Sequence, residues 1–217
     1  MIINNIMKHL FFLLFIFLAL NMSAQKFNFS SGVLLSGGVK LSELNQNLVK
    51  FGAPFPNRLI GGDLEITYSF KDNYVLSFRP IFMSNLIKND SISTHCSESM
   101  FTMNFGKTFK LIDDFKFKPT FGYAVIFINV NSKFNDKTLI SNQPKVKLPT
   151  TSLYQLSSYT HSLIFSFETI LYDNYSFSAT YVLSLHIQEW TSNLYTFDQS
   201  FYDNLSNFFI GIKYNFK

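Results

Sequence analysis

Acidic, basic and imidazole side chains recur at alternate positions of several strand-like stretches, on the side opposite the large aromatic residues. Two neighbouring carboxylates could perform general acid–base catalysis, whereas carboxylates mixed with cations form ion pairs. The signs here are mixed and the residues come from many stretches, which favours a network of ion pairs. The residues expected on this face are Asp63, Glu65, Arg79, Glu98, Lys116, Lys118, Glu168, His186 and Lys213, and the ion-pair candidates are Glu65, Arg79, Lys116, Lys118, Glu168 and Lys213.

Nucleophilic catalysis would need a serine or cysteine within hydrogen-bond reach of a base. Ser162 directly follows His161, and neighbouring residues of a strand point to opposite faces, so these two side chains cannot form such a pair. We expect His161 to face outward and His186 inward. Cys96 is the single cysteine, forms no intramolecular disulfide and is predicted to lie in a loop. No catalytic residue is predicted.

The sequence also has no cysteine–histidine spacing typical of a metal site, no glycine-rich phosphate loop and no haem motif. We therefore expect no cofactor and no metal. The formal charge of +4 is small for 217 residues and no basic run is present, so nucleic acid is not an expected partner.

The composition indicates a chain rich in β-strands. It contains 27 Phe and 11 Tyr against one Trp, and only 15% of its residues are charged. Aromatic residues favour strands, and the length suits one domain of ordinary size. The expected fold class is therefore all-β, with much apolar surface to place.

The N-terminus has the layout of a secretory signal peptide. Lys8 stands in a short polar region, the stretch 10–20 is an unbroken apolar run, and Met22-Ser23-Ala24 offers small residues for cleavage. A membrane anchor is the alternative, but the run is well short of the roughly 20 residues that span a bilayer as a helix. We predict a cleaved signal peptide over 1–24 and one domain over 25–217.

The mature chain divides into eight strand-like runs, each long enough for the roughly 9–13 residues that a tilted strand needs to cross a membrane. Short, polar turns at 71–73, 110–114 and 172–174 alternate with long segments at 40–58, 85–96, 131–157 and 189–204, as in bacterial outer-membrane barrels. Both termini then lie with the short turns, on the periplasmic side. The predicted runs are 27–39, 59–70, 74–84, 97–109, 115–130, 158–171, 175–188 and 205–216.

Each run has one nearly continuous apolar face and one polar face. Alternation alone fits a soluble lipocalin-like barrel or a periplasmic sandwich equally well, with the apolar face inside. The export signal, the strand lengths with asymmetric loops, and aromatic residues beside the short turns favour the opposite arrangement, with the apolar face toward lipid. We predict an eight-stranded antiparallel up-and-down transmembrane β-barrel in the outer membrane, with a lumen filled by its own side chains.

The hairpin around Lys71-Asp72-Asn73 allows a more detailed prediction. If Phe70 pairs with Tyr74 across a three-residue turn, Glu65 lies directly opposite Arg79 inside the barrel, where the two would form a cross-strand ion pair. Pro80 cannot donate to the ladder, so a bulge there could shift the register beyond it.

The signal peptide ending in SAQ, the eight alternating runs and the terminal FFIGIKYNFK together resemble the small outer-membrane β-barrel proteins of the Bacteroidetes type, including PorT-like proteins. The resemblance covers the whole mature chain. It implies delivery by periplasmic chaperones and insertion by the barrel assembly machinery, with outer-membrane lipid and lipopolysaccharide as surroundings.

Three function classes remain open at this stage. The first is a non-enzymatic structural or binding barrel that meets an envelope or external partner through its long loops, above all 131–157 with its lysines. The second is an accessory subunit of an outer-membrane secretion or transport system, as the PorT-like resemblance implies. The third is a lipid A-modifying enzyme. Passage of a solute through the lumen and a further hairpin within 131–157 are likewise left open.

Overall fold

The computed structural model describes residues 26–37, 46, 52–54, 57–135, 152–192 and 202–216. The signal peptide predicted over 1–24 lies outside the described residues, as do much of 40–58 and all of 136–151. The further hairpin left open within 131–157 therefore stays untested. In the described part of the chain no helix is long and apolar enough to cross a membrane.

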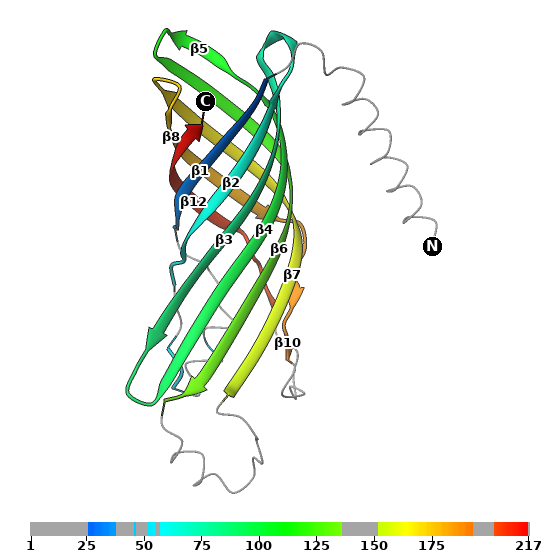
Figure 1. Ribbon diagram of the computed structural model, residues 1–217. Coiled ribbons are helices and arrows are strands. Elements are labelled where there is room, and N and C mark those ends of the chain that lie inside the picture. Colours follow the sequence, from blue (N-terminus) through cyan, green and yellow to red (C-terminus); the bar gives the residue numbers. More distant parts are fainter. Residues whose placement is uncertain are drawn as a thin grey trace, which may run out of the picture.

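Eight long strands form a closed antiparallel barrel, as the sequence predicts (Figure 1). Each strand pairs with the next along the chain, β6 pairs with β7, and β12 closes the barrel against β1. Their bounds are β1 Lys26–Ser36, β2 Ile60–Ser69, β3 Tyr74–Lys88, β4 Ile92–Lys107, β6 Phe115–Phe134, β7 Ser152–Leu171, β8 Tyr175–Ser184 and β12 Asn207–Phe216.

Short strands decorate the two ends of the barrel. At one end, which we call the turn end, β5 (Phe109–Ile112) extends the β4–β6 connection and pairs with β6. At the opposite loop end, β9 (Gln188–Glu189) pairs with β11 (Tyr202–Asp203), and β10 (Thr191–Ser192) pairs with β7. The predicted turn over 110–114 is therefore shorter, because residues up to Ile112 are strand.

Four strands continue well past the others at the loop end (Figure 1). β3 runs to Lys88 and β4 starts at Ile92, so the predicted loop over 85–96 was wrong. A tight turn replaces it, in which the Asn89 carboxamide oxygen accepts hydrogen bonds from the backbone N–H groups of Ser91 at 3.0 Å and Ile92 at 2.7 Å. β6 and β7 likewise extend beyond the predicted runs, whereas β8 ends at Ser184.

The hairpin between β2 and β3 has the predicted register. Phe70 donates its backbone N–H to the Tyr74 carbonyl at 2.7 Å, and Asp72 and Asn73 adopt left-handed backbone conformations that these residue types tolerate. The register is the same at Ile66↔Phe78 and at Asp63↔Ile81, so Pro80 does not shift it. Between these two pairs the ladder is interrupted, as the missing N–H of proline requires.

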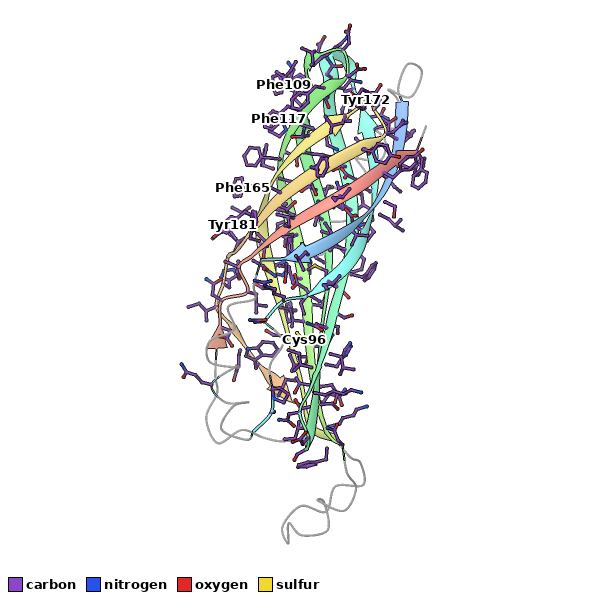
Figure 2. All side chains as sticks on the ribbon, turned by 90° about the vertical axis from the view of Figure 1, so that its left-hand side faces the viewer. Cys96, Phe109, Phe117, Phe165, Tyr172 and Tyr181 are labelled. Carbon is purple, nitrogen blue, oxygen red and sulfur yellow. The ribbon has the colours of Figure 1, made fainter. Side chains whose placement is uncertain are left out.

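The outer surface of the barrel carries the aromatic residues. Figure 2 shows Phe165 and Tyr181 projecting from the outer wall, and Phe121 is 59% exposed. The alternate residues of the same strands point inward and are buried, among them Ser166 and Thr180. This arrangement is the reverse of a soluble barrel, and it confirms that the apolar face of these strands is the outside.

The interior itself changes character along the barrel. Toward the turn end it holds charged and hydroxyl side chains, whereas toward the loop end it holds an apolar cluster that we call the loop-end core. The members of the loop-end core are Leu34, Ala53, Leu59, Ile81, Met83, Ile92, Cys96, Met100, Ala124, Ile126, Ile128, Val130, Leu156, Ile164, Val182, Trp190, Leu205 and Phe209.

Candidate functional site

Six ionisable side chains from five strands meet inside the turn-end half of the barrel. Asp63 and Glu65 come from β2, Arg79 from β3, Lys118 from β6, Glu168 from β7 and Lys213 from β12, and each is at most 7% exposed. We call these six residues the lumen charge cluster. Alternation alone predicted that all six face inward, because each stands at the parity of its strand that avoids the aromatic residues.

Lys213 lies at the centre of this cluster. Its Nζ contacts a carboxylate oxygen of Glu65 and lies 3.4 Å from Glu168 and 3.9 Å from Asp63. Lys118 bridges Glu168 at 2.7 Å and Glu65 at 3.2 Å. Because three carboxylates face three cations, the cluster carries no net charge, and each buried charge has a partner, as burial requires.

Arg79 pairs with a different residue from the one that the sequence predicts. The register does place it opposite Glu65, but its Nε contacts the Asp63 carboxylate. The long arginine side chain can reach along the strand to Asp63. The carboxylate of Glu65 already forms ion pairs with Lys118 and Lys213. Arg79 also donates from Nη1 to the Thr180 hydroxyl at 3.4 Å, which ties β3 to β8 across the lumen.

A glycine makes room for this network. Gly32 of β1 pairs with Lys213 on one side and with Asp63 on the other. A Cβ atom at this position would lie 2.7 Å from the Lys213 Cγ and 2.8 Å from the Asp63 Oδ1. Both contacts are too short, so the absence of a side chain at Gly32 is what lets the lysine and the carboxylate enter the lumen together.

Two predicted members of the inward set are located elsewhere. Lys116 belongs to the first turn-end residues of β6, where its Nζ lies 2.5 Å from Asp173 in the β7–β8 turn, and both side chains are accessible to solvent. His186 was predicted to face the lumen but is exposed, because β8 ends two residues before it at Ser184. Neither residue joins the lumen charge cluster.

Cys96 and Glu98 lie deeper toward the loop end. Cys96 is fully buried within β4, so its predicted position in a loop was wrong, and Figure 2 shows it among the long strands. Glu98 faces inward as predicted and is 2% exposed. Asn207 donates to its carboxylate at 3.4 Å, and no cation of the described residues lies within ion-pair distance of it.

Segments from the loop end contribute buried side chains to the apolar cluster. Trp190 is 2% exposed, and its indole N–H donates to the Asp203 carboxylate at 3.0 Å, which joins the two arms of the β9–β11 ribbon. Leu205 and Leu59 pack into the same cluster. The loop-end core was not predicted from the sequence, although the apolar inward positions Ile126, Ile128 and Val130 of one strand were a signal for it.

The described residues offer no nucleophile–base pair inside the barrel. Ser162 is buried and faces inward, whereas His161 faces outward beside Tyr123, whose hydroxyl contacts the His161 Nδ1, as predicted for neighbours on a strand. No group of three or more metal-ligating side chains occurs in the described ranges. What the described residues place in the lumen is a set of ion pairs and an apolar cluster.

No protein-family model matches the chain, and a search of curated proteins finds none similar to it. Among solved structures, it is similar to Ail, the attachment invasion locus protein of Yersinia pestis, with 13% identity, a TM-score of 0.47 and coverage of 90% of this chain and all of that one. A major outer membrane protein from Thermus thermophilus matches with 10% identity, a TM-score of 0.46 and coverage of 87% and 99%. OprG from Pseudomonas aeruginosa matches with 12% identity, a TM-score of 0.44 and coverage of 88% and 95%.

The class of this protein follows from its own geometry. Eight antiparallel strands close completely, their outer surface is a band of exposed aromatic and aliphatic residues, and the ionisable side chains of the membrane-facing region are paired inside. Only closed barrels and helices satisfy every backbone group in lipid. The chain is an integral β-barrel of the outer-membrane type.

Proposed function

We propose that this protein is a non-enzymatic, non-conducting barrel of the outer membrane that acts as a structural or binding protein through its loop end. The observation that carries the proposal is the filled lumen. The lumen charge cluster fills the turn-end half, and the loop-end core, which includes Trp190 and Leu205, fills the other half. A barrel of eight strands is narrow enough for its own side chains to fill, which supports this interpretation.

The loop end is proposed to face the cell exterior. Both ends of the described chain, Lys26 and Phe216, lie at the turn end together with the tight turns, and outer-membrane barrels place short turns in the periplasm (Figure 1). The four strands that continue at the opposite end would then stand outside the membrane. Protease added to intact cells should cut within 136–151 and spare the turns at 113–114 and 172–174; the reverse pattern would refute this orientation.

Conductance of the purified barrel in a planar bilayer tests the closed lumen. We expect no current steps above those of the bare bilayer. A variant with Lys118→Ala and Lys213→Ala removes the two lysines that bridge the carboxylates and serves as the control that could open a path. Regular current steps with the unchanged protein would refute the proposal.

The PorT-like assignment remains a finer prediction of the sequence, and with it the role as an accessory subunit of a secretion system. Crosslinking in intact cells followed by purification would recover such a partner in a fixed ratio to the barrel. A lipid A-modifying activity is disfavoured, since Ser162 and His161 point to opposite faces. Among the described residues, His161 contacts a tyrosine hydroxyl and no serine hydroxyl hydrogen-bonds to an imidazole nitrogen.

A further inference from the structure

The outer face of the four long strands changes abruptly at one row of residues. Phe82, Ser99, Phe127 and Tyr159 lie side by side across β3, β4, β6 and β7. The three aromatic rings are 42–58% exposed, and Phe127 stacks on Tyr159 at 6.4 Å between ring centroids. Aromatic rows of this kind mark the membrane–water interface, so we take this row as the loop-end boundary of the lipid band.

Beyond this boundary the outward residues are small and polar. The next row toward the loop end consists of Ser84, Ser97, Asn129 and Ser157. The row after it holds His95 and Asn131, with Leu86 beside them. Hydroxyl and carboxamide groups on a rigid sheet both donate and accept hydrogen bonds, as a ligand rich in hydroxyl groups requires.

The last row carries cations. Lys88 pairs with Ser93 across β3 and β4, and Ser93 pairs with Lys133 across β4 and β6. The two lysines therefore stand two strand spacings, or about 10 Å, apart on the same face. His95 is one row closer to the membrane, and all three side chains are exposed. We call the outward face of these three rows the polar wall.

The cations of the polar wall differ from those at the turn end in their partners. Lys110 pairs with Asp113 at 2.7 Å and Lys116 with Asp173 at 2.5 Å. For Lys88, His95 and Lys133, no carboxylate of the described residues lies within 4.0 Å. The polar wall thus presents two lysines that form no ion pair with a described carboxylate, against one carboxylate, Asp90, in the adjoining β3–β4 turn. Its net charge is positive, which is the property of a surface for anions.

The height of the polar wall narrows the choice of anion. Each lysine follows the aromatic residue of its own strand by six positions, Lys88 after Phe82 and Lys133 after Phe127. At about 3.3 Å per residue and a tilt of about 40°, it stands about 15 Å above that aromatic residue. The polar layer of an ordinary phospholipid leaflet is only about 5–7 Å thick. A glycolipid has acyl chains at the level of the aromatic row and phosphorylated sugars above them. This order matches the aromatic row, the hydroxyl-binding rows and the cationic row of the barrel.

We propose that the polar wall binds the phosphorylated core sugars of lipopolysaccharide in the outer leaflet. The serine and asparagine rows contact sugar hydroxyls, and Lys88, His95 and Lys133 contact phosphate or carboxylate groups. This inference rests on the proposed orientation, because only the exterior leaflet contains such a glycolipid.

Titration of the refolded barrel in detergent with lipopolysaccharide tests the proposal. The variant Lys88→Ala with Lys133→Ala should bind lipopolysaccharide at least about tenfold more weakly than the unchanged protein. Its affinity should also depend less on salt concentration. The control variant Lys110→Ala with Lys116→Ala removes the same charge at the turn end and should change the affinity less than about twofold. Heat modifiability on gels verifies that both variants are folded.

Two outcomes would overturn the proposal. Equal losses in the two variants would show that only net charge matters, and equal affinity for lipopolysaccharide and for phosphatidylglycerol in mixed micelles would show that the sugars do not contribute. Neither outcome depends on the orientation of the barrel in the membrane or on its conductance, since binding is measured in detergent. A failure of the proposed function would appear separately, as cleavage at the turn end of intact cells or as current steps.

Discussion

The two halves of this barrel are built on opposite principles, although the same strands run through both. In the turn-end half of β6, Phe121 faces outward and Lys118 faces the lumen. In the loop-end half of the same strand, Asn129 and Asn131 face outward, whereas Ile128 and Val130 are fully buried inside. β4 shows the same inversion. In its turn-end half Phe105 faces outward and Asn104 inward, whereas in its loop-end half Ser97 faces outward and Cys96 inward.

The inversion reflects a change of solvent along the strand. Where lipid surrounds the barrel, apolar residues are stable outside and polar groups must be paired inside. Where water surrounds it, burial of apolar area drives the loop-end half to fold like a soluble β-protein around its own core. The outer face changes at the row of Phe82, Phe127 and Tyr159. The apolar interior begins closer to the turn end, because Ile164 and Val182 already belong to the loop-end core.

The largest expected effect tests the charged half. Lys213→Met leaves two cations for three buried carboxylates, and removing one partner of a buried network should lower the free energy of unfolding by about 3–5 kcal/mol. Urea titration of the barrel in lipid vesicles measures it. Lys110→Met, at an exposed pair, is the matched control and should have little effect. Equal losses would mean that water reaches Lys213.

The apolar half should respond to loss of volume instead. Ile128→Ala should lower the free energy of unfolding by about 3 kcal/mol, because Ile128 is 1% exposed in the loop-end core and its removal leaves a cavity. Asn129→Ala, the neighbouring outward position, should change it by less than about 0.5 kcal/mol. If the asparagine variant were the more damaging one, the polarity of this half would be misassigned.

On the outer face, the stability cost of an added arginine should fall beyond the aromatic row at the loop-end side of the lipid band. Phe121→Arg lies near the middle of the lipid band and should cost about 2–4 kcal/mol of stability in vesicles. Asn131→Arg, on the same face of the same strand, should cost about 0–1 kcal/mol. Equal costs would move the boundary beyond Asn131.

A finer comparison concerns the choice of partner within the charged half. A double-mutant cycle for Asp63 and Arg79 should give a coupling near the upper end of about 0.5–3 kcal/mol, since the two side chains are in contact. The cycle for Glu65 and Arg79 should give a smaller value. A larger coupling for Glu65 would restore the directly opposed pair that the register suggests.

The smallest effect is expected at the exposed turn. A hydrogen bond from Lys110 and its positive charge hold the pKa of the Asp113 carboxyl below its usual value, and both side chains are exposed. A lowered pKa in the folded state stabilises the protein above the pKa of the unfolded state, and this contribution disappears as the pH falls through the folded pKa. Solvent screens the pair, so acid unfolding of Asp113→Asn should superimpose on that of the unchanged protein.

Sequence patterns predicted the membrane-facing half well because they are local there. A period of two separates Phe121 from Lys118 and Leu183 from Thr180 without knowledge of any other strand. The same reasoning failed at 85–96, where Ser93 and His95 replace the outward apolar residues. A strand whose outward residues are polar resembles a loop if every outward residue is expected to be apolar. For this reason β3 and β4 were predicted too short.

The sequence by itself determined that eight strands cross the membrane and which of their faces points to lipid. It also determined the three-residue turn between β2 and β3 and the inward position of the lumen charge cluster. Only the tertiary structure decided that Arg79 pairs with Asp63, that Lys213 from the last strand completes the network, and that Trp190 and Leu205 belong to the loop-end core. Faces follow from the geometry of one strand, whereas partners depend on the stagger and closure of strands far apart in the chain, which no local pattern encodes.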